Sequence, residues 1–285
     1  MTDSANTDLQ FRPLAAADLP AAANLSKRVG WPHRLEDWRF LAGAAVSLAV
    51  EAEGTLIGTA MGWHLGPGHF SVGMVIVDPD RQGGGIGRRL MDAILAEAQG
   101  RVVILNATDA GIGLYERLGF ARAGRVQQHQ GMATAPALPA LGRDVRLRPV
   151  TAADADAIAA LDRQATGLDR AAILRALATA GDAVLLEHGG RPVGFAFCRH
   201  FGRGQLVGPV IAPTLDAAKR LIGYWLSSRA GSFVRADVPE DSGLPEWLAT
   251  LGLAPVAPVV PMVRGAAPAP KGPARVFGLI AQAIG

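Results

Sequence analysis

Residues 77 to 90 read V-D-P-D-R-Q-G-G-G-I-G-R-R-L, and the rest of the chain is organised around this stretch. It begins at the end of a β-branched run, which Asp78-Pro79 stops because proline cannot continue a strand ladder. Four glycines follow within the loop, and apolar residues then recur at roughly helical spacing from Ile86 onward. The stretch therefore predicts a strand, a glycine-rich loop and the start of a helix.

A loop of this kind is suited to binding anions. The first N–H groups of a helix lack intrahelical partners, and the helix dipole favours negative charge at that end. Glycines let a phosphate approach the backbone, and Arg81, Arg88 and Arg89 add positive charge. A P-loop is excluded because no Lys-Ser or Lys-Thr follows the glycines, and the G-x-G-x-x-G spacing of a Rossmann loop is missing. A flexible strand-to-helix turn stays open as the alternative.

A second motif lies further along the chain. Residues 106 to 120 read N-A-T-D-A-G-I-G-L-Y-E-R-L-G-F, after an apolar strand expected at 102–105. We expect Tyr115 on a short helix that Gly119 ends, because glycine readily adopts the left-handed conformation that closes helices.

The two motifs together resemble those of the GNAT superfamily of acyl-CoA-dependent N-acyltransferases. The spacing Gln82-x-x-Gly85-x-Gly87 is similar to its pyrophosphate loop, and Leu-Tyr-x-x-x-Gly-Phe at 114–120 is similar to its second signature. The resemblance implies the α/β (α+β) class, with a mixed, mostly antiparallel sheet flanked by helices. It also implies an N-acyltransferase with acetyl-CoA as co-substrate and no metal.

The resemblance assigns roles to particular residues. The pantetheine arm of acetyl-CoA would pair with an open strand edge at Val75 and Val77, and the N–H of Val75 would stabilise the oxyanion. The loop would hold the pyrophosphate, and Asn106 and Thr108 would lie near the pantetheine arm. The remaining predicted cofactor contacts are Gln82, Gly83, Gly84, Gly85, Ile86, Gly87 and Arg88.

Tyr115 is the predicted general acid, which would protonate the leaving thiolate. A tyrosine has a reference pKa near 10 and a thiol near 8.5, so full proton transfer would be uphill by roughly 2 kcal/mol. Partial transfer in the transition state, or a Tyr115 pKa lowered by a nearby arginine, would reduce that cost. The alternative is that Tyr115 only packs and hydrogen-bonds the sulfur.

The general base and the acceptor are harder to name. His64 and His69 flank an expected strand turn and could take the amine proton directly or through water, although histidines in turns are usually just solvated. Glu36 and Asp37 lie in the region that borders the substrate in this superfamily. They could bind a cationic amine, or they could simply begin a solvated helix. The acceptor is therefore an amine of a small molecule or of a protein.

The composition excludes several classes of protein. There is no run of about 18 apolar residues, so no membrane span is expected, and the polar N-terminus lacks the pattern of a signal peptide. The single cysteine, Cys198, excludes an intrachain disulfide and fits the cytoplasm, and we expect it to be a small buried side chain. The net charge is only +3, and its basic residues are not interleaved with aromatics. We therefore expect no nucleic acid or membrane partner, while a homodimer stays open.

The chain then starts the same fold again. Phe11-Arg12-Pro13 lies over Leu147-Arg148-Pro149, an offset of 136, and the same offset places Gly54 on Gly190 and Gly58 on Gly194. Residues 143–265 are therefore predicted to be a second copy of the first domain. The first copy has the element order βααβββαβαβ, with its strands expected at 9–14, 46–53, 55–64, 69–77, 102–105 and 122–129.

The second copy has lost the features of a cofactor site. Its strand at 206–211 ends at Ala212-Pro213, but T-L-D-A-A-K-R-L follows at once, with no glycine loop. Leu248 takes the place of Tyr115. The whole chain resembles tandem GNAT proteins with a degenerate C-terminal domain, so catalysis is predicted in the first domain only.

The predicted domains are 1–130, an N-terminal GNAT acetyltransferase domain, and 143–265, the degenerate copy. The Ala, Pro and Gly-rich residues 131–142 are predicted to link them, and 266–285 form a tail. Apolar residues of the tail could make one face of a short helix docked on the protein surface, namely Val276, Phe277, Leu279, Ile280 and Ile284. Residues of the second domain on an expected turn could contact substrate, namely Arg199, His200 and Arg203.

The leading hypothesis is an acetyl-CoA-dependent N-acetyltransferase that transfers its acetyl group directly to an amine. A second hypothesis is a non-catalytic acyl-CoA-binding sensor or scaffold. A third is an acyltransferase that uses a longer acyl-CoA or transfers to oxygen.

Overall fold

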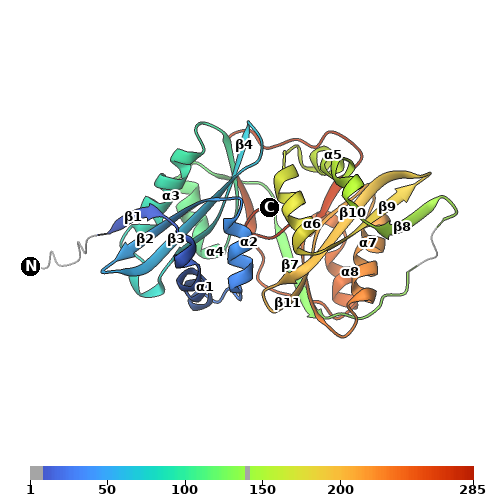
Figure 1. The fold of residues 1–285 in the computed structure, drawn as a ribbon, viewed down its shortest axis with the longest axis horizontal. Helices are drawn as coiled ribbons and strands as arrows, with labels where there is room; N and C mark the ends of the chain where they lie inside the picture. The colour runs from blue at the N-terminus through green and yellow to red at the C-terminus, as the bar shows by residue number, and fades with distance from the viewer. Residues whose placement is uncertain (1–8, 139–141) are drawn as a thin grey trace, which may run out of the picture. The chain divides into compact units, whose positions relative to one another are not determined.

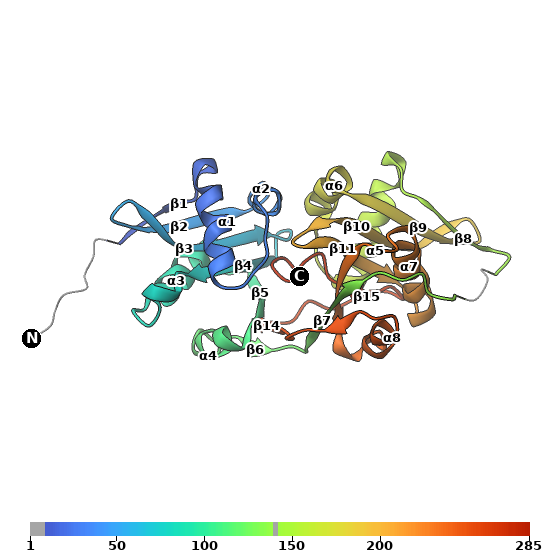
Figure 2. The same ribbon diagram turned by 90° about the horizontal axis from the view of Figure 1, so that it is seen from below.

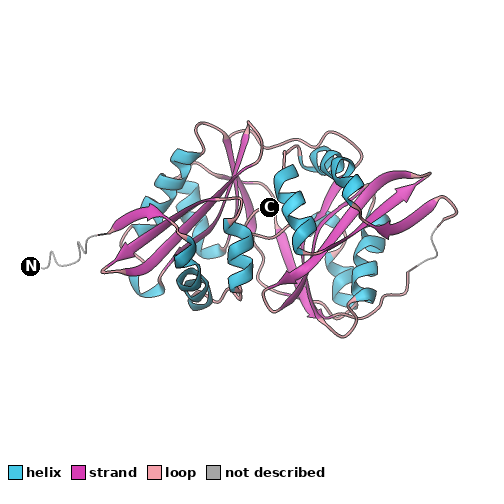
Figure 3. Ribbon diagram, viewed as in Figure 1, coloured by secondary structure: helices cyan, strands magenta, loops and turns pink. Residues whose placement is uncertain are grey.

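The computed structural model describes residues 9–138 and 142–285, and the chain divides into two compact units, Met1–Val103 and Ile104–Gly285. The polar N-terminal residues 1–8 and part of the predicted linker, 139–141, lie outside the described residues. Two mixed sheets flanked by helices confirm the expected α/β class (Figure 3). No helix in the described part of the chain has the length and apolarity needed to cross a bilayer.

The first unit is built on an antiparallel meander. Its strands are β1 (Gln10–Pro13), β2 (Val46–Ala52), β3 (Thr55–His64) and β4 (His69–Val77), and they lie side by side in that order. Its helices are the short η1 (Ala16–Asp18) and η2 (Pro79–Arg81), with α1 (Leu19–Arg28), α2 (Leu35–Ala42) and α3 (Ile86–Glu97). Helices α1 and α2 cover one face of the sheet and α3 covers the other (Figures 1 and 2).

The apolar stripe of each helix fixes the face that it buries. Leu90 and Ile94 lie one turn apart on α3 and are fully buried, as are Trp38 and Leu41 on α2. Each such side chain contributes roughly 1.5–3 kcal/mol when it leaves water. This packing holds α3, and with it the glycine loop at its start, against the sheet.

Strand β4 carries a bulge at its centre. Thr59 on β3 pairs with Ile76, whereas Met61 pairs with Gly73, so β4 has one residue more than β3 between these pairs. Met74 lies within the bulge and adopts a left-handed φ of 51°. A bulge bends its strand and redirects the local backbone groups.

The second unit begins within β5 (Val102–Ala107) and contains the second sheet. Its order is β13-β7-β12-β11-β10-β9-β8, and β15 pairs with β11 beside this path. Besides β5, the strands of this unit are β6 (Ala121–Arg122), β7 (Val126–Met132), β8 (Val145–Pro149), β9 (Asp182–His188), β10 (Arg191–Phe201), β11 (Gly204–Ala212), β12 (Phe233–Pro239), β13 (Ala254–Pro255), β14 (Val260–Arg264) and β15 (Arg275–Gly278). Of these, β6 and β14 do not belong to the second sheet. The helices are α4 (Asp109–Arg117), η3 (Ala152–Asp154), α5 (Ala155–Thr166), α6 (Ala171–Ala180), α7 (Leu215–Ser228), η4 (Glu240–Ser242) and α8 (Pro245–Thr250).

An ion-pair triad shows that the second copy repeats the first. In the first unit the Arg12 guanidinium binds Asp18 at 2.6 Å and Glu51 at 2.8 Å. The hydrogen bond from Arg12 lowers the pKa of Asp18 below its usual value. At the offset of 136 the same triad recurs in the second unit, at 2.7 and 2.8 Å, as Arg148, Asp154 and Glu187.

The last strands of the two copies are exchanged. The sequence predicts one strand at 122–129, but the structure has β6 and β7 there, and they pair with different partners. Arg122 of β6 pairs with Met262 of β14, while β7 pairs with β12 and β13. Each copy therefore receives its final strand from the other copy's part of the sequence.

In the described chain, the tail contains the short strand β15 and no helix, so the prediction of a short helix there is wrong. Val276 of β15 pairs with Ile211 of β11, and Gly278 pairs with Val210. Leu279 then donates its backbone N–H to the Asp237 carbonyl on β12, at 2.9 Å. The predicted docking of the tail on the protein is confirmed by these contacts.

Candidate functional site

The glycine loop leaves the first amides of α3 without a side-chain cap. Gly85 is the residue that precedes the helix and has a left-handed φ of 77°, a conformation that glycine adopts without strain. The first intrahelical bond of this end runs from the Arg89 N–H to the Gly85 carbonyl, at 3.1 Å. The N–H groups of Ile86, Gly87 and Arg88 therefore remain as the donors that a helix start offers to an anion.

The beginning of the loop is anchored to the rest of the first unit. Arg28 at the end of α1 forms ion pairs with Asp78 and, at 2.7 Å, with Asp80. Gln82 donates its side-chain amide to the Val77 carbonyl at 3.1 Å. The role of Arg28 could not be predicted from the sequence, because nothing in the local pattern joins it to a loop fifty positions away.

The three arginines near the loop are used differently. Arg88 pairs with Asp92 one turn further along α3, at 3.0 Å, and both side chains are exposed. The Arg89 guanidinium lies 4.4 Å from the centre of the Phe11 ring. Arg81 is exposed at the end of η2. Exposed ion pairs are weak, so Arg88 can still turn toward a bound anion.

Val75 and Val77 lie half-buried on β4, Val75 next to Met74 in the bulge and Val77 at the end of the strand. Their positions place the predicted cofactor edge in the same unit as the loop from Gln82 to Arg88.

Asn106 and Tyr115 belong to the second unit. The Asn106 side chain donates to the Gln282 carbonyl at 2.9 Å, a contact with the tail that the sequence did not predict. Thr108 begins α4 without a side-chain cap.

Tyr115 is a buried residue of α4, with 8% of its surface exposed. Its ring lies 6.0 Å from that of Phe120 and covers Gly111, where a Cβ would come within 2.8 Å of it. Burial raises the pKa of Tyr115 to about 12. The suggestion that an arginine lowers this pKa is therefore wrong, and Tyr115 keeps its proton at neutral pH.

The residues weighed as base or amine ligand lie in different surroundings. The exposed His64 packs against Phe70, with 5.0 Å between ring centroids. Asp37 is 1% exposed and accepts hydrogen bonds from the backbone N–H of Arg34 at 2.8 Å and from its guanidinium. Asp37 thus caps α2 and is not available to a cationic amine. Glu36 is exposed and lies 3.8 Å from Arg39, and His69 is half-buried at the start of β4.

Two expectations for the second unit have different outcomes. Cys198 is buried, as predicted, and burial raises the pKa of its thiol to about 11. Arg199 does not lie on a turn as expected. It is a buried residue of β10, its guanidinium lies 4.5 Å from the Phe201 ring centroid, and it reaches the Ile280 carbonyl at 3.4 Å. Only Arg203 is exposed at the turn itself, and His200 hydrogen-bonds Gln205.

In the second unit the counterpart of the predicted cofactor edge is occupied by the tail. Thr59 on β3 pairs with Ile76 on β4, and its counterpart Phe195 on β10 pairs with Ile211 on β11. Residues 75–77 on β4 therefore correspond to residues 210–212 on β11. These are the residues of β11 that pair with β15. Leu279 lies so close that a Cβ on Gly208 would meet its carbonyl oxygen at 2.0 Å. An extended ligand therefore cannot lie along this edge while β15 is in place.

The helix start and the tyrosine are also replaced in the second unit. Thr214 caps α7 with its own side chain, which accepts from the Ala217 N–H at 3.2 Å. Leu248 occupies the position of Tyr115. The Leu248 carbonyl accepts a hydrogen bond from the Leu253 N–H at 3.1 Å. The Tyr115 carbonyl accepts the equivalent bond from the Phe120 N–H at 3.0 Å.

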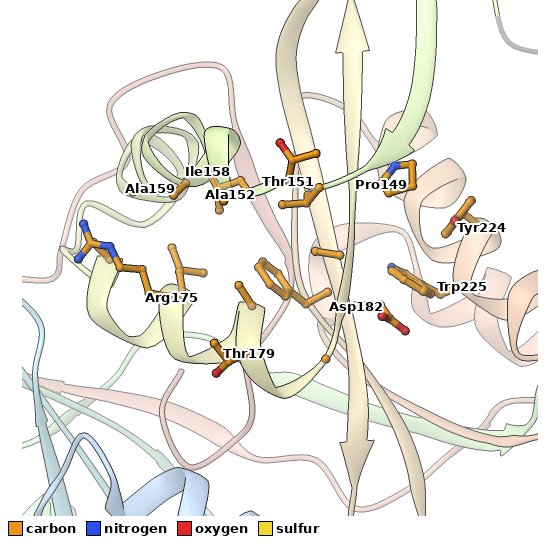
Figure 4. A pocket seen from close by; sticks show the side chains of 18 of the residues that line it. Pro149, Thr151, Ala152, Ile158, Ala159, Arg175, Thr179, Asp182, Tyr224 and Trp225 are labelled. Carbon is orange, nitrogen blue, oxygen red and sulfur yellow. The ribbon is translucent and has the colours of Figure 1, made fainter.

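A cavity of about 670 Å³ lies in the second unit, between α5, α6, β9, β10 and α7 (Figure 4). Ile158, Phe197 and Trp225 form apolar parts of its wall, while Arg175 and Asp182 lie at exposed positions around it. A concave apolar site with a few polar groups is the usual form of a small-molecule site. This cavity could not be predicted from the sequence, because its walls come from several elements that are far apart along the chain.

Two comparisons with protein families match different halves of the chain. Residues 15–120 match the acetyltransferase (GNAT) family, and residues 158–278 match an acetyltransferase (GNAT) domain. The first match contains both sequence motifs, and the second covers residues 158–265 of the predicted second copy. The tandem arrangement inferred from the repeat is therefore confirmed.

Relatives and solved structures agree with this assignment. The uncharacterized N-acetyltransferase YitH of Bacillus subtilis is 30% identical over 75% of this chain and 76% of its own length. A candidate acetyltransferase from Pyrococcus horikoshii has a TM-score of 0.80 at 19% identity, over 100% of this chain and 99% of that one. A tandem GNAT protein from the clavulanic acid pathway has a TM-score of 0.65 at 18% identity, over 93% of this chain and 100% of that one. The chain thus belongs to the GNAT family of acetyltransferases and is an N-acetyltransferase with two GNAT domains in tandem.

Proposed function

We propose that this enzyme transfers an acetyl group from acetyl-CoA directly to an amine, and that only the first GNAT domain binds the co-substrate. The observation that carries the proposal is the contrast between two equivalent strand edges. Val75 and Val77 precede an uncapped, glycine-rich helix start, whereas residues 210–212 are covered by β15 and precede a capped helix.

In the proposed reaction the neutral amine nitrogen attacks the thioester carbon, and the carbonyl oxygen takes up negative charge. The N–H of Val75 stabilises that oxyanion, while the amides of the loop and of α3 hold the pyrophosphate. The C–S bond then breaks and Tyr115 supplies a proton to the departing sulfur. The nitrogen loses its proton to water or to a base in the acceptor site.

The raised pKa of Tyr115 sets the timing of the proton transfer. Complete transfer from a group with a pKa of about 12 to a free thiolate of pKa near 8.5 would be uphill by about 5 kcal/mol. The proton must therefore move as the C–S bond breaks, while the sulfur is gaining charge.

Calorimetric titration with acetyl-CoA tests the proposal without knowledge of the acceptor. We expect one site per chain, because the second edge is occupied by β15. Thiol release with a panel of small amines and peptide amines then separates an enzyme from a sensor. Two sites per chain would contradict the assignment to the first domain. Tight binding without turnover on any amine would favour the non-catalytic sensor or scaffold.

The ionisation of Tyr115 is expected only at strongly alkaline pH. Tyrosinate absorbance of the wild type minus that of Tyr115→Phe should rise with a midpoint near pH 12, because burial disfavours the charged phenolate. The folded-state pKa lies above the unfolded value near 10. The contribution of Tyr115 to the free energy of unfolding is therefore fully present below pH 10. It is lost as the pH rises toward 12, by up to about 3 kcal/mol. A midpoint near 10 in protein that is still folded would show that Tyr115 is not buried.

A further inference from the structure

A buried threonine holds the bulge of β4 in place. Thr59 on β3 has none of its surface exposed, and its Oγ1 donates a hydrogen bond of 2.8 Å to the Met74 carbonyl. Met74 is the residue with the left-handed φ of 51°. A residue other than glycine is strained in that conformation, so the surrounding structure must maintain it. The Thr59 hydroxyl is a fixed partner for this part of the backbone.

The hydrogen bond also sets the direction of one backbone donor. The Met74 carbonyl and the Val75 N–H belong to the same planar trans peptide unit, so they point in opposite directions. Because Thr59 lies on β3, it holds the carbonyl on the β3 side of the strand. The Val75 N–H consequently points away from β3, toward the opposite edge of β4. A hydrogen bond accepted by the carbonyl also polarises the peptide and strengthens its N–H as a donor.

The second unit lacks this device. The residue that corresponds to Thr59 is Phe195, which pairs with Ile211 as Thr59 pairs with Ile76. Phe195 has no hydroxyl to donate. The threonine is therefore present in the copy whose edge precedes the glycine loop and absent from the copy whose edge is covered by β15.

We propose that Thr59 is a positioning residue that aims the Val75 N–H at the thioester carbonyl of acetyl-CoA. The inference rests on the proposed function, because it assumes that acetyl-CoA lies along β4. Thr59 does not touch the reacting atoms. It acts through the Met74–Val75 peptide, in the bound state and more strongly when the carbonyl oxygen becomes an oxyanion.

Calorimetry with two ligands isolates this contact. Acetyl-CoA has the thioester carbonyl and CoA does not, while both share the pantetheine and the pyrophosphate. In Thr59→Val the preference for acetyl-CoA over CoA should fall about fivefold, the value of one neutral hydrogen bond, with CoA affinity unchanged. Thr59→Ser, which keeps the hydroxyl, should restore the preference. A merely structural role would weaken both ligands together.

Turnover gives a second readout once an acceptor is known. Thr59→Val should lower kcat at least tenfold, while the KM for acetyl-CoA rises no more than the roughly fivefold loss of binding, because the donor matters most in the transition state. Thr134→Val is the matched control. It removes another threonine hydroxyl that donates to a backbone carbonyl, that of Leu251 at 3.1 Å, and should change neither readout.

The outcomes separate this proposal from the proposed function. A wild type that binds neither ligand contradicts the proposed function. A wild type that prefers acetyl-CoA, with the same preference in Thr59→Val, overturns the role of Thr59. So does a wild type that binds both ligands equally well. If Thr59→Val does not fold, Thr59→Ala takes its place, because its smaller side chain cannot clash, and the same ratio of affinities decides.

Discussion

Gly85→Asp should weaken acetyl-CoA binding at least 100-fold. Gly85 begins α3 with a left-handed φ of 77°, and the amides that follow it are the proposed pyrophosphate donors. An aspartate there places a carboxylate beside the pyrophosphate and can cap the helix itself, which uses a donor. Losing two charge-assisted hydrogen bonds at about 1.5–3 kcal/mol each corresponds to a factor of roughly 10² to 10⁴. Calorimetric titration of the folded variant measures the loss.

Gly54→Asp is the matched control. Gly54 also has a left-handed φ, of 75°, and is exposed at the turn between β2 and β3. The same substitution there introduces the same charge and the same backbone strain without touching the loop. It should therefore bind acetyl-CoA like the wild type. Equal weakening in both variants would mean that strain or net charge, rather than the loop, causes the loss.

Tyr115→Phe should lower kcat at least tenfold and leave acetyl-CoA affinity nearly unchanged. General acid catalysis typically supplies factors of about 10² to 10⁴, and the substitution removes only the hydroxyl. The phenyl ring can keep its packing against Phe120 and Gly111. Steady-state kinetics with an identified amine, together with calorimetry, separates the effect on the reaction from the effect on binding.

The chain offers a control for this variant as well. Tyr224 is the second of two tyrosines and lies on α7, beside the cavity of the second unit. Tyr224→Phe removes the same group and should leave the kinetics unchanged. An unchanged kcat in Tyr115→Phe would contradict the role as general acid and leave Tyr115 as a packing residue.

The sequence was sufficient where the determinants are local. β3 and β4 have the predicted bounds, 55–64 and 69–77, because a turn and Asp78-Pro79 mark their ends. The repeat was visible because the offset of 136 holds across separate elements, and the triad of Arg12 shows it again in side-chain contacts. The glycine loop was recognisable because its conformations need glycine, as the φ of Gly85 confirms.

Features that depend on distant partners could not be predicted. Asp37 looked like a solvated carboxylate, because its burial depends on how α2 packs and not on its local ion pair with Arg34. The tail has apolar residues that fit one face of a helix, and periodicity over so few positions does not distinguish a helix from a strand. The bulge gave no signal, because Met74 is a residue type that rarely adopts a left-handed φ. The Tyr115 pKa follows from burial, which a motif does not reveal.

The exchanged strands have a consequence for the order in which the protein is made. β6 emerges from the ribosome early, but β14, its partner through Arg122 and Met262, follows on the order of 140 residues later, a pairing of high contact order. At a translation rate of about 5 to 20 residues per second, β6 remains without its partner β14 for some 7 to 30 seconds. During translation this unpaired edge is a site where a chaperone could bind, or where a second nascent chain on the same messenger RNA could pair wrongly.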